Sequence, residues 1–142
     1  MTNPTTATST TRTATAIWPC LIFHDARAMS AFLVEAFGFE ETGVYAREDD
    51  PSIVEHGELR WPLGGGIMFG SHGRDDTVFG QRSPGNDSTY VVCDNPDDLF
   101  ARATAAGAEV VRGLRDEDYG SRGFTVRDPE GNIWSFGTYW GE

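Results

Sequence analysis

The sequence predicts an α+β fold in which one β-α-β-β-β module occurs twice within a single domain. Residues 25–40 and 94–109 each have the pattern of an amphipathic helix that ends at a Gly and leads into a strand. The Asp, Gly and Glu of this pattern recur at one fixed offset. Residues 59–64 and 126–131 repeat a second pattern, an apolar residue followed by Arg, Pro and Gly in the same order. Two like units predict a pseudo-symmetric domain whose functional site lies where the units meet.

The first module is expected over residues 15–70. Residues 17–24 are mostly apolar, with β-branched and aromatic side chains typical of a strand. Asp25 stands at the N-cap of a helix, and Gly38 stands where a left-handed residue ends one. The helix places one apolar face inward, formed by Met29, Phe32, Leu33, Ala36 and Phe37. Three strands are expected to follow at 39–47, 53–61 and 66–70, with a tight turn at Gly64-Gly65-Gly66.

The second module is expected over residues 88–140, after a linker loop at 71–87. A strand at 88–93 leads to a helix capped by Asp94 or Asn95, with Pro96 in its first turn. The inner face of this helix is predicted to be Leu99, Ala103 and Ala106. Further strands are expected at 108–112, 123–127 and 132–140. Residues 115–118 read as a charged loop, and residues 128–131 as a tight turn.

Composition narrows the function classes. Residues 1–14 are rich in Thr, Ala and Ser and are expected to be a disordered tail. The net charge of −11 disfavours binding to nucleic acid. The chain has neither the apolar stretch of a signal peptide nor a run long enough to span a membrane, so we expect a cytoplasmic protein without a membrane partner. Cys20 and Cys93 lie in apolar strand-like runs and are expected to be buried free thiols.

Several short motifs, in this order and spacing, resemble the glyoxalase / bleomycin-resistance / extradiol-dioxygenase superfamily, also called vicinal oxygen chelate. They are Asp25-Ala26, residues 32–39, residues 56–60, Tyr119-Gly120-Ser121-Arg122, Asp128-Pro129-Glu130-Gly131-Asn132 and residues 134–139. The resemblance covers about residues 15–140. It implies a cupped, barrel-like mixed sheet with a cleft shared by the two modules, and a homodimer. It does not fix the activity, because one fold hosts many functions.

The same resemblance, combined with the two-residue period of strands, assigns side chains to the cleft. On the helix side we expect Leu21, Phe23, Leu59, Trp61, Trp134 and Phe136. The ligand-binding cleft is expected to be lined by Trp18, Ile22, His56, Glu58, Tyr90, Tyr119, Ile133 and Ser135.

Enzymes of this superfamily generally hold a divalent metal with His, Gln or Glu near the starts of the first and fifth strands and a Glu on the last strand. Those positions fall on Trp18, on Ser88 (or Asp87 with a one-residue shift) and on Ser135. Trp cannot ligate a metal and neutral Ser is a poor ligand. We therefore expect neither a metal nor another cofactor. His24 and His72 lack ligand spacing, whereas His56 and Glu58 share a strand face, as a hydrogen-bonded pair or a partial metal site.

Three functions remain open at this point. The first is a metal-free homodimer that binds a small organic molecule, with drug sequestration as one version, because aromatic and apolar walls suit a flat or partly cationic ligand. The second is a lyase, isomerase or dioxygenase with a relocated or absent metal site, or a cofactor-independent catalyst that uses Tyr119, His56 or Glu58. The third is a dimeric interaction module with a collapsed cleft.

Overall fold

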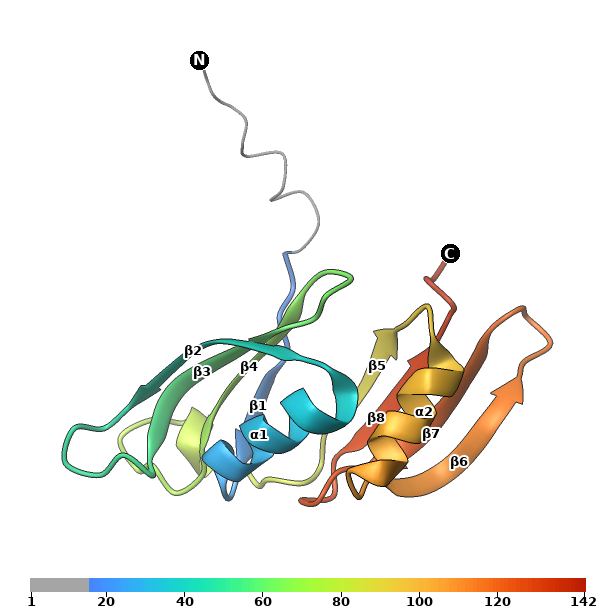
Figure 1. Ribbon diagram of the computed structural model, residues 1–142. Coiled ribbons are helices and arrows are strands. Elements are labelled where there is room, and N and C mark those ends of the chain that lie inside the picture. The colour runs from blue at the N-terminus through green and yellow to red at the C-terminus, as the bar shows by residue number, and fades with distance from the viewer. Residues whose placement is uncertain (1–15) are drawn as a thin grey trace, which may run out of the picture.

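The computed structural model describes residues 16–142, so the tail expected at 1–14 lies outside the described residues. Two modules of identical plan lie side by side (Figure 1). The first contains β1 (Cys20–Phe23), α1 (Ala26–Phe37), β2 (Glu40–Ala46), β3 (Val54–Arg60) and β4 (Gly66–Ser71). The second contains β5 (Ser88–Val92), α2 (Pro96–Ala105), β6 (Glu109–Asp116), β7 (Arg122–Arg127) and β8 (Ile133–Gly137). The predicted pair of β-α-β-β-β modules is confirmed.

Each module forms its own four-stranded mixed sheet. The strand orders are β1-β4-β3-β2 and β5-β8-β7-β6, so the second sheet repeats the first. The pairs β1–β4 and β5–β8 are parallel and the other neighbours are antiparallel. The two sheets do not close into one continuous barrel. The linker between the modules carries a single 3-10 turn, η2 (Phe79–Gln81).

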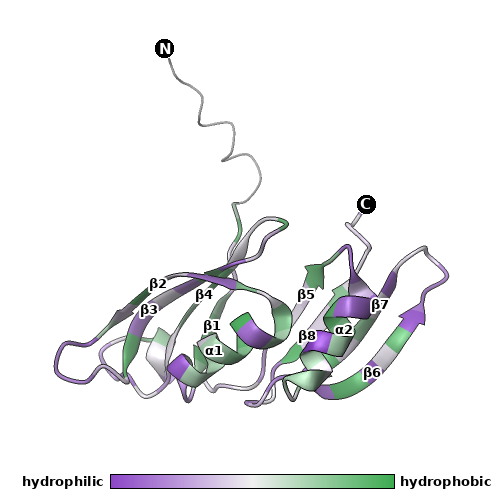
Figure 2. Cartoon of the chain, in the orientation of Figure 1, coloured by the Kyte–Doolittle hydropathy of each residue, from purple (hydrophilic) through white to green (hydrophobic). Residues whose placement is uncertain are grey.

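The helices begin and end largely as their sequences predict. The side chain of Asp25 accepts a hydrogen bond from the amide of Ala28 at 3.1 Å, and Gly38 adopts a left-handed φ of 92°. α2 starts with Pro96 after Asn95, whose side chain makes no capping bond. Along both helices hydrophobic and hydrophilic residues alternate in Figure 2, as amphipathic helices require. In residues 16–142 neither helix is long and apolar enough to cross a membrane.

The core lies between the helices and the sheet faces they cover. Five aromatic side chains link the two modules, with ring centroids of neighbouring pairs 4.7 to 5.9 Å apart: Phe37, Phe39, Trp61, Trp134 and Phe136. All five are buried. α1 also lies beside α2 in Figure 1, so the modules share one hydrophobic core.

The strand limits differ from expectation by more than one residue in three places. β1 begins at Cys20 rather than residue 17, because Pro19 has no N–H to donate to the ladder. β8 ends at Gly137 rather than residue 140, where its parallel partner β5 also ends. β6 continues through Arg115 and Asp116, which pair with the start of β7, so these two residues belong to a strand and not to a loop.

The two cysteines differ in their exposure to solvent. Cys93 is buried, as expected, but Cys20 is exposed. The expectation for Cys20 was wrong because the first residue of β1 points to the sheet face that α1 does not cover. Neither cysteine forms a disulfide.

Candidate functional site

Each sheet has one face covered by its helix and a second face, called here the open face. Along β8, Trp134 and Phe136 are buried in the shared core, where both rings contact Phe37 of α1, while Ser135 between them is half-buried on the open face. Along β3, Leu59 is buried, whereas His56 and Glu58 point to the open face. The burial along β8 and β3 thus follows the predicted side-chain alternation. Because both helices lie on the same side (Figure 1), both open faces turn to the opposite side.

The open face of the first module carries a cavity of about 240 Å³, called here the first cavity. The linker covers it, and its walls include Ile22, His56, Met68, Gly70, Phe79 and Arg82. Nε2 of His56 lies 2.8 Å from Oε2 of Glu58. The ring of Tyr45 stacks near His56, with centroids 6.2 Å apart. The expected hydrogen-bonded pair of His56 and Glu58 is therefore present, beside an apolar wall.

The open face of the second module carries a smaller cavity of about 180 Å³, called here the second cavity. Its walls include Ser88, Tyr90, Glu117, Tyr119, Ser121 and Ser135. The hydroxyl of Tyr90 donates to the carbonyl of Tyr139 at 2.7 Å, and partial burial raises the pKa of this phenol. The guanidinium of Arg115 lies 2.8 Å from Glu117 and holds the pKa of that carboxyl below its usual value.

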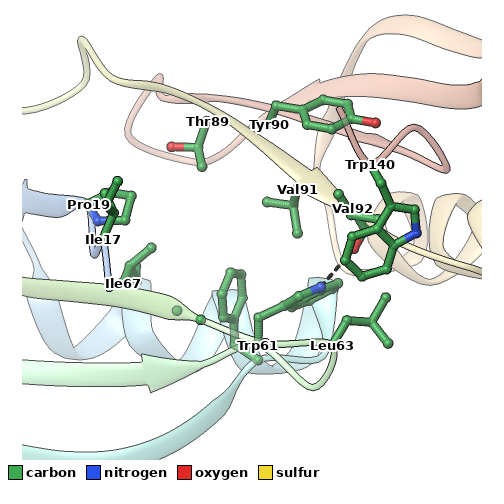
Figure 3. A pocket seen from close by; sticks show the side chains of 14 residues that line it. Ile17, Pro19, Trp61, Leu63, Ile67, Thr89, Tyr90, Val91, Val92 and Trp140 are labelled. Carbon is green, nitrogen blue, oxygen red and sulfur yellow. Dashed lines mark hydrogen bonds between the residues drawn. The ribbon is translucent and has the colours of Figure 1, made fainter. Parts of the chain in front are cut away.

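A third space of about 310 Å³, the intermodule groove, lies between the modules. Figure 3 shows side chains from both modules facing each other across it, with Trp61 and Leu63 of the first module opposite Val91 and Trp140 of the second. At its floor Nε1 of Trp61 donates to the carbonyl of Val92 at 2.8 Å. The groove is apolar and open to solvent at Trp140 and Ile17.

The structure distributes the eight predicted cleft residues over several places. Ile22 and His56 line the first cavity, and Glu58 is bonded to His56. Tyr90, Tyr119 and Ser135 line the second cavity, and Tyr90 also lines the groove. Ile133 is half-buried opposite Ser88. Trp18 precedes β1, and its ring lies against Gly66. The predicted cleft residues of one chain are thus divided between separate cavities rather than converging on one.

Sequence reasoning missed the linker's contribution to the first cavity. Arg74, Phe79 and Arg82 all lie in the linker and all line that cavity. The available signal was Phe79, an aromatic residue in a loop rich in Gly, Asp and Ser.

The residues at the expected metal positions do not fit a metal ion. Trp18 has no ligating atom, Ser88 is a neutral hydroxyl, and the Oγ of Ser135 is engaged with the Oγ1 of Thr125 at 3.0 Å. The carboxylate of Asp87 lies 3.7 Å from Arg82. Across residues 16–142, no three His, Cys, Asp or Glu side chains are grouped so that they could hold a metal.

Comparisons with known proteins agree with this architecture. A family model for the Glyoxalase/Bleomycin resistance protein/Dioxygenase superfamily matches residues 15–136. TioX from Micromonospora sp. ML1 is 29% identical, with a TM-score of 0.72 over 87% of this chain and 97% of that one. A glyoxalase/bleomycin resistance protein/dioxygenase family enzyme from Burkholderia phytofirmans PsJN is 24% identical, with a TM-score of 0.65 over 84% and 94% of the chains. The integron cassette protein VCH_CASS1 from the V. cholerae mobile metagenome is 18% identical, with a TM-score of 0.67 over 88% and 96%. The last two likenesses show the fold alone. No curated protein matches the sequence.

Proposed function

Because this chain belongs to the glyoxalase/bleomycin resistance protein/dioxygenase superfamily, we propose that it is a metal-free homodimer that binds a small organic molecule on the open faces of its sheets. Sequestration of a toxic compound is one version of this function. The relatives' chemistry does not by itself decide between binding and catalysis.

The observation that carries the proposal is the set of residues at the superfamily's metal positions. Trp18, Ser88 and Ser135 replace the His, Gln or Glu side chains that the metal would need. The first cavity keeps aromatic and apolar walls with a few polar groups, which is the usual make-up of a small-molecule site, and the second cavity adds Tyr90 and Tyr119 among hydroxyl and charged groups. Such a surface favours binding without metal chemistry.

Exposed apolar side chains on both open faces support the homodimer. Phe79 beside the first cavity and Tyr119 beside the second are both more than half exposed, at 57% and 61%. Since the two open faces of one chain lie side by side, they cannot face each other within that chain. Pairing the first module of one subunit with the second module of its partner would cover both residues and join the two cavities into one cleft.

Filling the second cavity with a large side chain tests whether the ligand binds there. Ser135→Trp places a large ring on the open face of β8, whereas Ser52→Trp makes the same change on an exposed turn. A panel of aromatic fragments should raise the melting temperature of the wild type and of Ser52→Trp, but not of Ser135→Trp. Equal shifts in all three proteins would move the site away from the second cavity, and no shift in any would remove the binding proposal. Light scattering after gel filtration should give twice the chain mass.

One observation favours a second candidate, an enzyme without a metal. His56 and Glu58 form a hydrogen-bonded pair beside the first cavity, and such a pair can move a proton. Elemental analysis of the purified protein separates the remaining alternatives. Near-stoichiometric zinc, nickel, manganese or iron would favour a metalloenzyme with a relocated site over metal-free binding.

A further inference from the structure

We propose that the first cavity binds the carboxylate of a small aromatic or alkyl monoanion, and that Arg74 is the residue that holds it. The inference rests on the proposed small-molecule binding and names the class of ligand. It replaces the flat or partly cationic ligand expected from the sequence, because the charged groups that line this cavity are mainly cationic.

Arg74 is a buried cation whose hydrogen bonds are incomplete. Its side chain lines the first cavity, and the residue is only 7% exposed. Nε donates to the carbonyl of Ser71 at 2.7 Å and Nη1 to the carbonyl of Glu55 at 3.2 Å. Within the described part of the chain, Nη2 has no acceptor and no Asp or Glu forms an ion pair with the guanidinium. A buried charge without a counter-charge is costly, and two carbonyls offset only part of that cost.

The sheet is shaped to admit this guanidinium. Gly70 lies on the open face of β4, opposite Ile22 of β1. A Cβ placed on Gly70 would lie 2.6 Å from Nη2 of Arg74 and 3.2 Å from its Cζ. Any side chain at position 70 would therefore push the guanidinium off the strand. The absence of a side chain there lets Nη2 rest at the cavity wall.

The other charged groups around the cavity already have partners. The carboxylate of Glu55 pairs with Arg47, and His56 is bonded to Glu58. Arg82, at the rim, lies 3.7 Å from Asp87. The chain as a whole carries a net charge of −11, so a cationic cavity in it is a local feature. Among these groups Arg74 is the one that an incoming anion would neutralise.

The chemistry of the cavity points to a carboxylate with an apolar body. A guanidinium presents a planar fork of N–H donors that matches a carboxylate. The remaining walls include Ile22, Met68 and Phe79, which suit a hydrocarbon or aromatic group. A volume of about 240 Å³ lies just below the range of about 300–1,000 Å³ that is usual for ligand pockets, which favours a small ligand. The acidic protein opposes a dianion more strongly than a monoanion, which favours a carboxylate over a phosphate monoester.

A purely structural role is the competing explanation for Arg74, since its two bonds fasten the linker to β3 and β4. The two roles are separable by NMR titration of the ¹⁵N-labelled full chain with 2-naphthoate and with its neutral analogue 2-naphthamide. We expect the carboxylate to bind at least about tenfold more tightly, because one charge-assisted contact is worth about that factor. Its shifts should map to the amides of Gly70, Arg74 and Ile22.

Four variants complete the test. Arg74→Gln and Gly70→Ala should lose the preference for the carboxylate, the first by removing the cation and the second by displacing it. Arg27→Gln removes an exposed arginine whose Nε donates only to the carbonyl of Pro51, and Gly113→Ala adds a methyl group with no atom within 4 Å. These two controls should keep the preference. If Arg74→Gln fails to fold, Gly70→Ala decides.

Three results would overturn the inference: equal binding of the two probes, carboxylate shifts that leave the amides of Gly70, Arg74 and Ile22 unmoved, or an unchanged preference in Arg74→Gln or Gly70→Ala. Equal binding of both probes would leave the proposed small-molecule site standing and remove only its anion preference. The proposed function itself fails on the fragment panel, if no fragment stabilises the wild type. The two failures are therefore distinguishable.

Discussion

Glu130, on the turn between β7 and β8, accepts a hydrogen bond from the backbone amide of Asp25, the N-cap of α1 in the other module, at 2.8 Å. Its second carboxylate oxygen accepts from the amide of His24 at 2.7 Å. The matching turn of the first module makes the reciprocal contact, in which Trp61 donates to the carbonyl of Val92 at the end of β5. Each module thus uses its last hairpin to hold the end of the other module's first strand.

Removing the Glu130 carboxylate should destabilise the protein. Glu130→Ala leaves two amides without their charged acceptor at the start of α1, so we expect the free energy of unfolding to fall by about 1–3 kcal/mol. Glu130→Gln should lose less, because an amide oxygen can still accept a bond. Urea denaturation followed by circular dichroism measures the change. Glu48→Ala, on an exposed turn, is the control; equal stability of Glu130→Ala and Glu48→Ala would contradict the expectation.

The contact of Trp61 should be separable from its packing. Trp61→Phe keeps an aromatic ring beside Phe39 but removes the donor to Val92, so we expect a loss of about 1 kcal/mol. Trp61→Ala should cost about 3–5 kcal/mol, since it also opens a cavity in the core shared by the modules. Denaturation midpoints of both variants give the comparison. A Trp61→Phe protein as stable as the wild type would mean that the hydrogen bond contributes nothing.

The contacts of Glu130 and Trp61 between the modules show which features the sequence could predict and which it could not. Local chemistry correctly placed the Asp25 cap, the Gly38 helix end and the turn around Glu130, because each depends on neighbours in the chain. The hydrogen bond from the Asp25 amide to the Glu130 carboxylate depends on how the two modules pack against each other. No local sequence pattern predicts which residues that packing brings together. For the same reason the sequence did not predict that Arg74 lines the first cavity. Arg74 lies in a polar linker, and its position depends on hydrogen bonds to the carbonyls of Ser71 and Glu55.

Asp128 should be among the least replaceable residues of the second module. Its buried carboxylate accepts four hydrogen bonds, from the amides of Glu130 and Asn132, the Nδ2 of Asn132 and the Nε1 of Trp134. Each oxygen faces two donors, so Asp128→Asn sets its NH₂ group against two of them in either orientation. We expect a loss of about 2–5 kcal/mol in the free energy of unfolding. Thermal denaturation should show a lower melting temperature for Asp128→Asn than for the wild type. Asp118→Asn, on an exposed turn, is the control. Similar melting temperatures for both variants would contradict it.

The two thiols should react at very different rates. Cys93 is 2% exposed and burial raises its pKa to about 11, whereas Cys20 is exposed on β1. Since the thiolate is the reactive form, iodoacetamide at pH 8 should modify Cys20 readily and Cys93 only slowly. Cys20→Ser should therefore abolish fast labelling, and Cys93→Ser should leave it intact, as mass spectrometry of timed samples would show. The raised pKa also favours the neutral thiol in the folded state, so its contribution to stability is complete below the usual thiol pKa of 9.0 and is lost as the pH rises through about 11. Rapid modification of Cys93 in the folded protein at pH 8 would contradict its burial in the core.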